Sequence, residues 1–241
     1  MHPATTRQLI ELNRRFYADF GTHFSATRQR IQPGVRKIAA QLVGTEHILD
    51  LGCGNGEFAR SLAKNGFHGI YTGLDFSLPL LSDARSQPDG FSARFFETDL
   101  TTPGWERVLG LDHYSLITAF AVLHHIPASE MRLDILQKVR QLMEPTGKFI
   151  LSSWQFLNSE KLKNRIQPWE AAGLSAADVD ENDYLLDWRG GGSGLRYVHH
   201  FSPQELDQLA TASGFTVSES FFSDGEGDRL GLYQVWECHE N

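Results

Sequence analysis

Residues 48–58 read Ile48-Leu49-Asp50-Leu51-Gly52-Cys53-Gly54-Asn55-Gly56-Glu57-Phe58. This pattern is typical of a buried strand that ends in a glycine-rich turn and continues into a helix. A turn this tight needs residues without a Cβ, because they reach positive φ and let backbone N–H groups approach a ligand. A dinucleotide-binding turn has the pattern G-x-G-x-x-G/A, whose last residue lies beside the pyrophosphate. When this pattern is counted from Gly52, the anionic Glu57 occupies that last position. The stretch therefore argues against a dinucleotide and tolerates a cationic or zwitterionic ligand.

Further apolar runs follow at the spacing of alternating strands and helices. One run ends in Asp75, the next ends in Asp99, and a third, residues 114–123, leads into a pair of histidines. A carboxylate at the end of the second strand can accept hydrogen bonds from both hydroxyls of a ribose. Each acid alone is more often a strand-end cap, but both acids in register with the glycine turn predict a nucleoside-binding edge.

The strand–helix alternation continues to residue 154 and predicts a doubly wound α/β fold, a parallel sheet with helices on both faces. The ligand of such a sheet binds at the carboxyl ends of the strands, where the glycine turn and both acids lie. Five helices are expected: one at 4–20, one that starts at Pro33, one at 56–64, one from an N-capping Ser129 to Met143, and one that starts at a capping Ser202. A turn is expected at 144–147. Strands are expected at 148–154, 215–222 and 230–238, and the last two should form an antiparallel hairpin.

With these residues the chain resembles the class I S-adenosylmethionine (SAM) dependent methyltransferases, whose first motif is similar to residues 50–56. The resemblance implies a Rossmann-like seven-stranded sheet in the order 3-2-1-4-5-7-6 with the last strand antiparallel, and SAM as the cofactor. By this resemblance Asp75, at the end of the second strand, holds the ribose of the cofactor. Asp99, at the end of the third strand, and the following Leu100 frame its adenine. The implied cofactor-binding residues are Asp50, Gly52, Cys53, Gly54, Asp75, Phe76, Asp99, Leu100 and Ala119, the last through its backbone carbonyl.

Composition places the chain among cytoplasmic globular proteins. It has 241 residues, of which 41% are hydrophobic, enough for one large domain with a packed core. The two cysteines lie far apart, which argues against a disulfide framework and against a zinc site. No apolar stretch approaches the ~20 residues that span a bilayer, and the first residues lack a secretory signal. We therefore expect no metal and no membrane partner.

The chain is expected to form a single methyltransferase domain over residues 1–241, with a helical cap at 1–43 and an insertion at 155–200. The insertion has mixed charges and a glycine run at 190–194, and it is interpreted as a lid or acceptor-binding element. The net charge of −8 argues against nucleic acid, yet residues 1–40 hold seven basic and two acidic residues, a local charge of +5. A basic segment beside the site could guide a polyanion, although a solvated helix face explains the pattern equally well.

A more specific resemblance concerns the methyl acceptor. The fourth strand lacks the Asn/Asp-Pro-Pro-Tyr/Phe motif of enzymes that methylate exocyclic amines of nucleobases. The chain is instead similar to the eukaryotic tRNA wobble-uridine carboxymethyl methyltransferases, which convert 5-carboxymethyluridine to its methyl ester. That resemblance implies tRNA as a partner and a small zinc-binding activator subunit. It rests on Asn13, Phe16-Tyr17, Phe24, Thr27-Arg28, residues 121–126, residues 196–201 and Glu205-Leu206.

By this resemblance the catalytic and acceptor-binding residues are Arg28, His124, Arg196 and His199. An arginine suits a carboxylate or phosphate acceptor, which it can hold through two hydrogen bonds. The sequence departs from the family around Gln29, Gln32-Pro33 and residues 185–188, which affects the identity of the RNA. The histidines also fit plain capping of strand ends. In an extended segment, at most one of His199 and His200 faces a pocket.

Two other functions fit the same residues. A small-molecule O- or N-methyltransferase would use residues 1–40 and 155–200 as a closed lid over a metabolite, and the acidic net charge favours it. A SAM-binding regulator without catalysis would keep the cofactor residues but show no turnover.

Overall fold

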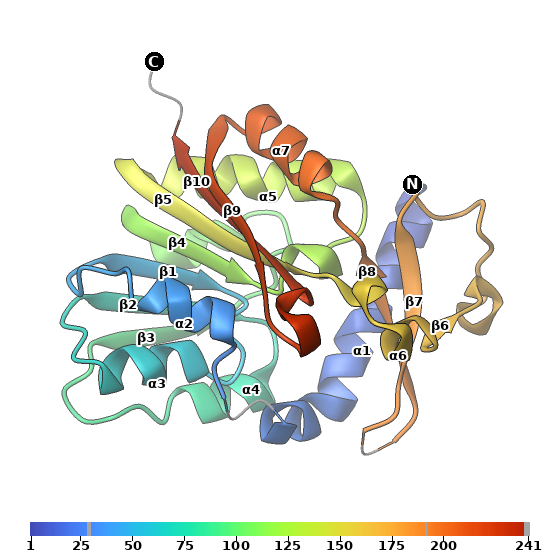
Figure 1. Cartoon of the computed structure of the whole chain (residues 1–241), viewed down its shortest axis with the longest axis horizontal. Coiled ribbons are helices and arrows are strands. Elements are labelled where there is room, and N and C mark those ends of the chain that lie inside the picture. Colours follow the sequence, from blue (N-terminus) through green and yellow to red (C-terminus); the bar gives the residue numbers. More distant parts are fainter. Residues whose placement is uncertain (28–29, 191, 239–241) are drawn as a thin grey trace.

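The computed structural model describes residues 1–27, 30–190 and 192–238, and a seven-stranded sheet forms its centre (Figure 1). The sheet order is β3-β2-β1-β4-β5-β10-β9. Neighbours among β1 to β5 pair in parallel, and β10 is antiparallel to both β5 and β9. The predicted order and the predicted terminal hairpin are confirmed. The strands are β1 His47–Leu51, β2 Ile70–Asp75, β3 Ala93–Glu97, β4 Tyr114–Phe120, β5 Met143–Trp154, β9 Phe215–Ser223 and β10 Gly231–Cys238.

Helices cover both faces of this sheet because successive strand residues point to opposite sides. Ile48 packs in one hydrophobic cluster with α2 and α3, whereas Leu49 packs in another with α5 and α7. The α-helices are α1 Pro3–Thr27, α2 Pro33–Ala39, α3 Glu57–Lys64, α4 Leu78–Ala84, α5 Ser129–Leu142, α6 Glu160–Lys163 and α7 Pro203–Ala212. Short 3₁₀ helices are η1 Trp105–Leu109, η2 Leu123–His125, η3 Phe156–Asn158, η4 Trp169–Ala172 and η5 Glu226–Asp228.

Three local predictions differ from the structure. Ser129 is the first residue of α5 rather than its N-cap; Ala128, with φ 64°, precedes it, and no side chain caps the helix. The helix ends at Leu142, and Met143 already belongs to β5, paired with Tyr114. The expected turn at 144–147 is an irregularity within that strand, because a proline or glycine in a ladder can mark a bulge as well as a turn. By contrast, Ser202 caps α7 as predicted.

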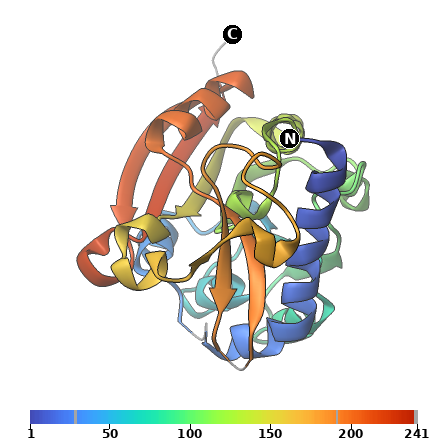
Figure 2. The ribbon, with the colours of Figure 1, turned by 90° about the vertical axis from the view of Figure 1, so that its right-hand side faces the viewer.

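A second, three-stranded antiparallel sheet lies within residues 155–200, the segment expected to be an insertion, where no strands were predicted. Its strands are β6 Ile166–Gln167, β7 Asp183–Trp188 and β8 Gly194–His199, in the order β6-β7-β8. Helix α1 lies alongside β8 at the outer edge of this sheet (Figure 2). The first helix and the insertion, which are far apart in sequence, therefore form one wall of the molecule.

Candidate functional site

A cavity of about 420 Å³ lies at the carboxyl ends of the central strands. Eight of the nine predicted cofactor residues line it. Ala119 does not; it is fully buried in the core of the sheet, and its neighbours Phe120 and Ala121 line the cavity in its place. The eight lining residues are Asp50, Gly52, Cys53, Gly54, Asp75, Phe76, Asp99 and Leu100.

The glycine turn gives the cavity its floor. Gly52, Gly54 and Gly56 all have positive φ, between 55° and 77°. A Cβ on Gly52 would lie 2.5 Å from a methyl carbon of Val122, and a Cβ on Gly56 would lie 2.8 Å from the Cα of Ala84. A Cβ on Gly54 would meet no protein atom within 4 Å. Gly54 therefore presents bare backbone to open space, which suits the close approach of a ligand such as SAM.

Asp75, at the end of β2, supports this turn. Its carboxylate accepts hydrogen bonds from the backbone N–H of Gly54 at 2.9 Å and from that of Ser77 at 2.8 Å. Burial raises the pKa of Asp75 to about 6, although these N–H groups act in the opposite direction. The glycine turn and the acid at the end of the second strand thus form one hydrogen-bonded unit.

Asp50 plays a different part in the same floor. It is buried, and its two oxygens accept hydrogen bonds from the hydroxyls of Tyr71 at 2.5 Å and Thr118 at 2.7 Å. Burial also raises the pKa of Asp50 to about 6. Its hydrogen bonds tie β1 to β2 and β4 beneath the turn, a positioning contribution that sequence reasoning did not foresee.

Asp99, which follows β3, is bound by the N-terminal helix. Its Oδ1 accepts from the backbone N–H of Thr101 at 2.8 Å and from the Thr101 hydroxyl at 2.6 Å. Its Oδ2 accepts from Nε of Arg14 at 2.7 Å and lies 2.6 Å from the Nη2 of the same guanidinium. The predicted adenine partner is thus joined to Arg14 of α1, a residue that no sequence pattern had indicated.

One face of α1 forms the opposite wall of the cavity. Ile10, Asn13, Arg14 and Tyr17 all line it, at the spacing of one helical stripe. Asn13 is buried; its Oδ1 accepts from the backbone N–H of Tyr197 at 2.8 Å, and its Nδ2 donates to the Tyr197 carbonyl at 3.2 Å. The same amide also donates to the carbonyl of His125. The helix is therefore anchored to β8 and η2 at the cavity.

The two histidines after β4 have different hydrogen-bond partners. Nδ1 of His125 lies 3.2 Å from the Tyr197 carbonyl, so that nitrogen carries a proton, and Nε2 then accepts from the Tyr17 hydroxyl at 3.0 Å in the neutral ring. His124 is buried, and its Nδ1 accepts from the backbone N–H of Trp154 at 3.3 Å. A neutral His124 therefore carries its proton on Nε2. Both rings line the cavity, and His124 is arranged as a donor.

Arg196 brings a buried cation to the cavity. The side chain lies on β8, is 5% exposed and is a lining residue. Its guanidinium carbon lies 4.6 Å from the ring centroid of Trp154, 5.5 Å from that of Phe16 and 5.8 Å from that of Trp188. Aromatic faces stabilise a desolvated guanidinium and fix its plane. Such a group favours an anionic ligand.

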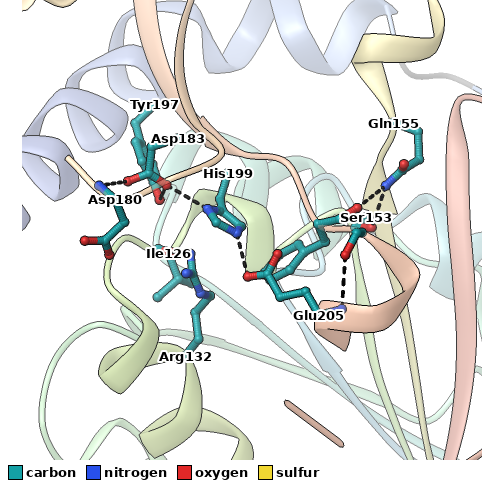
Figure 3. A network of polar contacts seen from close by, with 11 residues as sticks. Ile126, Arg132, Ser153, Gln155, Asp180, Asp183, Tyr197, His199 and Glu205 are labelled. Atoms are coloured by element: carbon teal, nitrogen blue, oxygen red, sulfur yellow. Dashed lines mark hydrogen bonds and ion pairs between the residues drawn. The ribbon is translucent and has the colours of Figure 1, made fainter. Parts of the chain in front are cut away.

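His199 lies outside the residues that line the cavity. Its Nδ1 is 2.7 Å from Oδ1 of Asp183 and its Nε2 is 2.7 Å from Oε1 of Glu205, so the ring bridges two carboxylates (Figure 3). Burial alone would lower the pKa of His199, but the hydrogen bonds to Asp183 and Glu205 raise it above its ordinary value. His200 does not line the cavity either, and burial lowers its pKa. Arg28, the remaining predicted residue, lies outside the described residues.

The hairpin between β9 and β10 supplies a further wall that the sequence did not indicate. Asp224 and Tyr233 both line the cavity. The carboxylate of Asp224 accepts from the backbone N–H of Gly34 at 2.9 Å and from the hydroxyl of Tyr233 at 2.5 Å. Burial raises the pKa of Tyr233, which keeps that hydroxyl protonated. Only tertiary packing brings these residues to the site, since Gly34 and Asp224 are 190 positions apart.

Across residues 1–27, 30–190 and 192–238, no three His, Cys, Asp or Glu side chains are grouped to hold a metal ion. Within the same residues, no helix has the length and hydropathy needed to cross a bilayer.

The chain is similar in sequence to known proteins along most of its length. A family model described as "Methyltransferase domain" matches residues 23–220. A putative methyltransferase of Encephalitozoon cuniculi is 30% identical over 204 residues, which cover 84% of this chain and 86% of that protein. The mouse tRNA (carboxymethyluridine(34)-5-O)-methyltransferase ALKBH8 is 24% identical over 184 residues, 73% of this chain but only 25% of that protein. A trans-aconitate 2-methyltransferase of Escherichia coli is 34% identical over 127 residues, 52% of this chain and 45% of that enzyme.

Solved structures share the fold. A SAM-dependent methyltransferase from Methanosarcina mazei superposes with a TM-score of 0.65 at 21% identity, and the match covers 87% of this chain and 99% of that one. The likeness extends to the sheet order and to the antiparallel end of the sheet.

Proposed function

This chain belongs to the family of SAM-dependent methyltransferases, and from that membership we propose that it methylates a carboxylate, first of all the carboxymethyl group of a modified tRNA wobble uridine. The observation that carries the proposal is Arg196, a buried guanidinium held against Trp154 in the wall of the cavity. A planar guanidinium can bind both oxygens of a carboxylate. The mouse relative is named for carboxymethyluridine and the Escherichia coli relative for trans-aconitate, and both of these acceptors carry carboxylates.

The proposed chemistry needs little from the protein beyond alignment. SAM supplies a methyl group on a positively charged sulfur, and the acceptor attacks it in line. A carboxylate is already anionic, so no residue has to remove a proton from it. This agrees with His124, whose Nδ1 accepts from Trp154 and whose Nε2 is therefore a donor rather than a base. Arg196 and His124 would orient the carboxylate for in-line attack on the methyl group.

On the cofactor side, the proposed roles follow the geometry of the floor. The bare backbone at Gly52 and Gly54 would lie against the methionine part of SAM, and Asp75 would accept the ribose hydroxyls. Asp50 would act through the turn that it supports. Because the Asp75 carboxylate already binds the N–H of Gly54, the nucleoside and the amino acid halves of SAM would be positioned by one connected unit.

Substitution of Arg196 tests the carboxylate site. Arg196→Gln and Arg196→Lys should each lower kcat/KM for a carboxylate acceptor roughly 10- to 100-fold, because hydrogen bonds to a charged group contribute about 1.5–3 kcal/mol. Affinity for S-adenosylhomocysteine (SAH) should stay within about twofold in isothermal titration calorimetry. The matched control is Arg189→Gln, an exposed arginine that pairs with Asp187 on the same small sheet. Equal activity of the Arg196 and Arg189 variants would contradict the proposal.

The acceptor itself is tested by transfer of labelled methyl from SAM to bulk tRNA. The tRNA comes from cells able and unable to make the carboxymethyl precursor, and the nucleosides are analysed by mass spectrometry. A base-labile methyl ester only on precursor-containing tRNA is the expected result. SAM binding without transfer to tRNA or to any metabolite would instead indicate a non-catalytic SAM-binding regulator.

A small-molecule carboxylate is the second candidate, and the charges of the chain favour it. The net charge is −8, and Arg14, Arg15 and Lys37 of the basic N-terminal segment each form an ion pair with an acid of the chain itself. Those pairs reduce the positive field available to a polyanion. Ionic strength separates the candidates. tRNA binding should weaken steeply between roughly 50 and 200 mM salt, because contacts to phosphates release bound counterions. A small acceptor should respond far less.

A further inference from the structure

Both oxygens of the Asp99 carboxylate, which follows β3, are fully occupied as hydrogen-bond acceptors. Each oxygen of Asp99 receives two donors, from Thr101 on Oδ1 and from Arg14 on Oδ2. A carboxylate offers about four lone-pair sites, so this one is saturated. An adenine amino group could bind it only by displacing one of these partners. The expected contact between Asp99 and adenine therefore conflicts with the contacts that the protein makes for itself.

The position of the nucleoside follows from the floor of the cavity. In sheets of this kind an acid at the end of the second strand holds the ribose, which places the sugar at Asp75. The glycine turn on the β1 side takes the amino acid half, so the base must extend to the other side, toward β3. Phe76, Leu100 and Asp99 line that end of the cavity, and Arg14 lines it from α1.

Arg14 is held in a way that suits a flat ligand. Two of its nitrogens, Nε and Nη2, lie 2.7 and 2.6 Å from the same oxygen of Asp99, which fixes the plane of the guanidinium. The side chain is 43% exposed, so it is not sealed between protein groups. A guanidinium fixed in this manner stacks on an aromatic ring, and an adenine offers such a ring.

We propose that Arg14, anchored by Asp99, is a cofactor-binding residue that α1 contributes to the SAM site by covering the face of the adenine. In this arrangement Asp99 acts through Arg14 instead of accepting the adenine amino group. The inference rests on membership of the SAM-dependent methyltransferase family and is independent of the acceptor. Its failure would leave the carboxylate proposal intact, because the test measures cofactor binding alone.

The helix does not depend on this ion pair for its position. Asn13 keeps three hydrogen bonds to Tyr197 and His125, and the Tyr17 ring packs edge-on against Phe76 with centroids 5.7 Å apart. Removing the Arg14 guanidinium should therefore leave α1 docked. The change then reports on ligand contact and not on folding.

The test is calorimetric titration of Arg14→Gln with two probes, SAH and 5′-methylthioadenosine, which keeps the nucleoside and lacks the amino acid. Both should bind about tenfold more weakly, since a cation–π contact to a partly desolvated ring is of that order. Arg14→Lys should lose nearly as much affinity for both probes, because a lysine keeps the positive charge but lacks the planar guanidinium group. The matched control is Arg15→Gln, whose arginine is the next residue of α1 and pairs within the helix to Glu11; its affinities should match the wild type.

Asp99→Asn separates direct from indirect action. If Asp99 only anchors Arg14, the losses of binding free energy for SAH in Asp99→Asn and in Arg14→Gln should not add in the double variant. Additive losses would mean that Asp99 touches the cofactor itself and would overturn the proposal. Unchanged or tighter binding of SAH by Arg14→Gln would overturn it as well, as would a loss seen with SAH but not with methylthioadenosine. Unfolding temperatures without ligand, expected to equal that of the wild type, confirm that each variant is folded.

Discussion

Asp75 is a buried carboxylate whose pKa, about 6, falls within the range of ordinary assays. Its ionised form is the one that can accept two ribose hydroxyls, so SAM affinity should depend on pH. Above pH 6 the affinity should be constant, and below it the apparent Kd should rise toward about tenfold per pH unit, as expected when one protonation blocks binding. Calorimetry between pH 5 and 8 measures this. Asp75→Asn should bind more weakly and with a flatter profile; an unchanged slope would assign the effect to another group.

Gly54 and Gly56 have similar backbone angles but different surroundings, and they should respond differently to alanine. Gly54→Ala places a methyl group in the cavity, so SAH should bind at least about tenfold more weakly, while stability falls only by the ~1–2 kcal/mol of a positive φ. Gly56→Ala forces its Cβ against the backbone of Ala84, so its loss of stability should be larger, about 2–4 kcal/mol. Urea unfolding and calorimetry distinguish the two. If the same variant lost more affinity for SAH and also more stability, the assignment of Gly54 to ligand contact and of Gly56 to packing would be wrong.

At the scale of elements, His199 links the small sheet to α7 through Asp183 and Glu205 (Figure 3). Its pKa is raised in the folded protein. The stability from this bridge is therefore fully present below about pH 6.5, the unfolded value, and is lost as the pH rises through the folded value. His199→Gln should cost about 2 kcal/mol at pH 6 and less at pH 9.

Urea unfolding of the wild type and His199→Gln at a series of pH values checks this. His200→Gln is the neighbouring control, because burial lowers the pKa of His200 and its contribution should not fall with rising pH. If the difference in free energy of unfolding between wild type and His199→Gln grew with rising pH, the proposed stabilisation by the Asp183–His199–Glu205 bridge would be wrong. The role of His199 in catalysis stays a prediction of the resemblance, and the acceptor assays with this variant address it directly.

Elements differed in how well local sequence predicted them. Long apolar runs with strand or helix periodicity predicted the central sheet and its covering helices. The small sheet was not predicted, because β6 has only two residues and β8 is held by an asparagine of α1. Capping patterns gave a mixed result: Ser202 has the predicted hydrogen bond, whereas Ser129 lies one position inside its helix. Tertiary packing decided these cases.

For the whole molecule, the floor of the cavity could be predicted from sequence, and its walls could not. The floor lies at strand ends, where one rule of topology places the glycine turn and its acids together. The walls join distant segments: Arg14 reaches Asp99 across 85 positions, and Asn13 reaches Tyr197 across 184. No local pattern signals such pairs. Arg196 was found only through resemblance, since its surroundings of Trp154, Phe16 and Trp188 come from three separate regions.

The side chain of Asn13 also has a consequence for self-association. β8 is the outer strand of the small sheet, and such an edge presents unpaired N–H and C=O groups to other chains. The amide of Asn13 donates to and accepts from Tyr197, as a residue of a neighbouring strand would, and α1 lies along the same edge. The helix thereby covers an edge that would otherwise be open to intermolecular β-pairing, on the strand that carries Arg196.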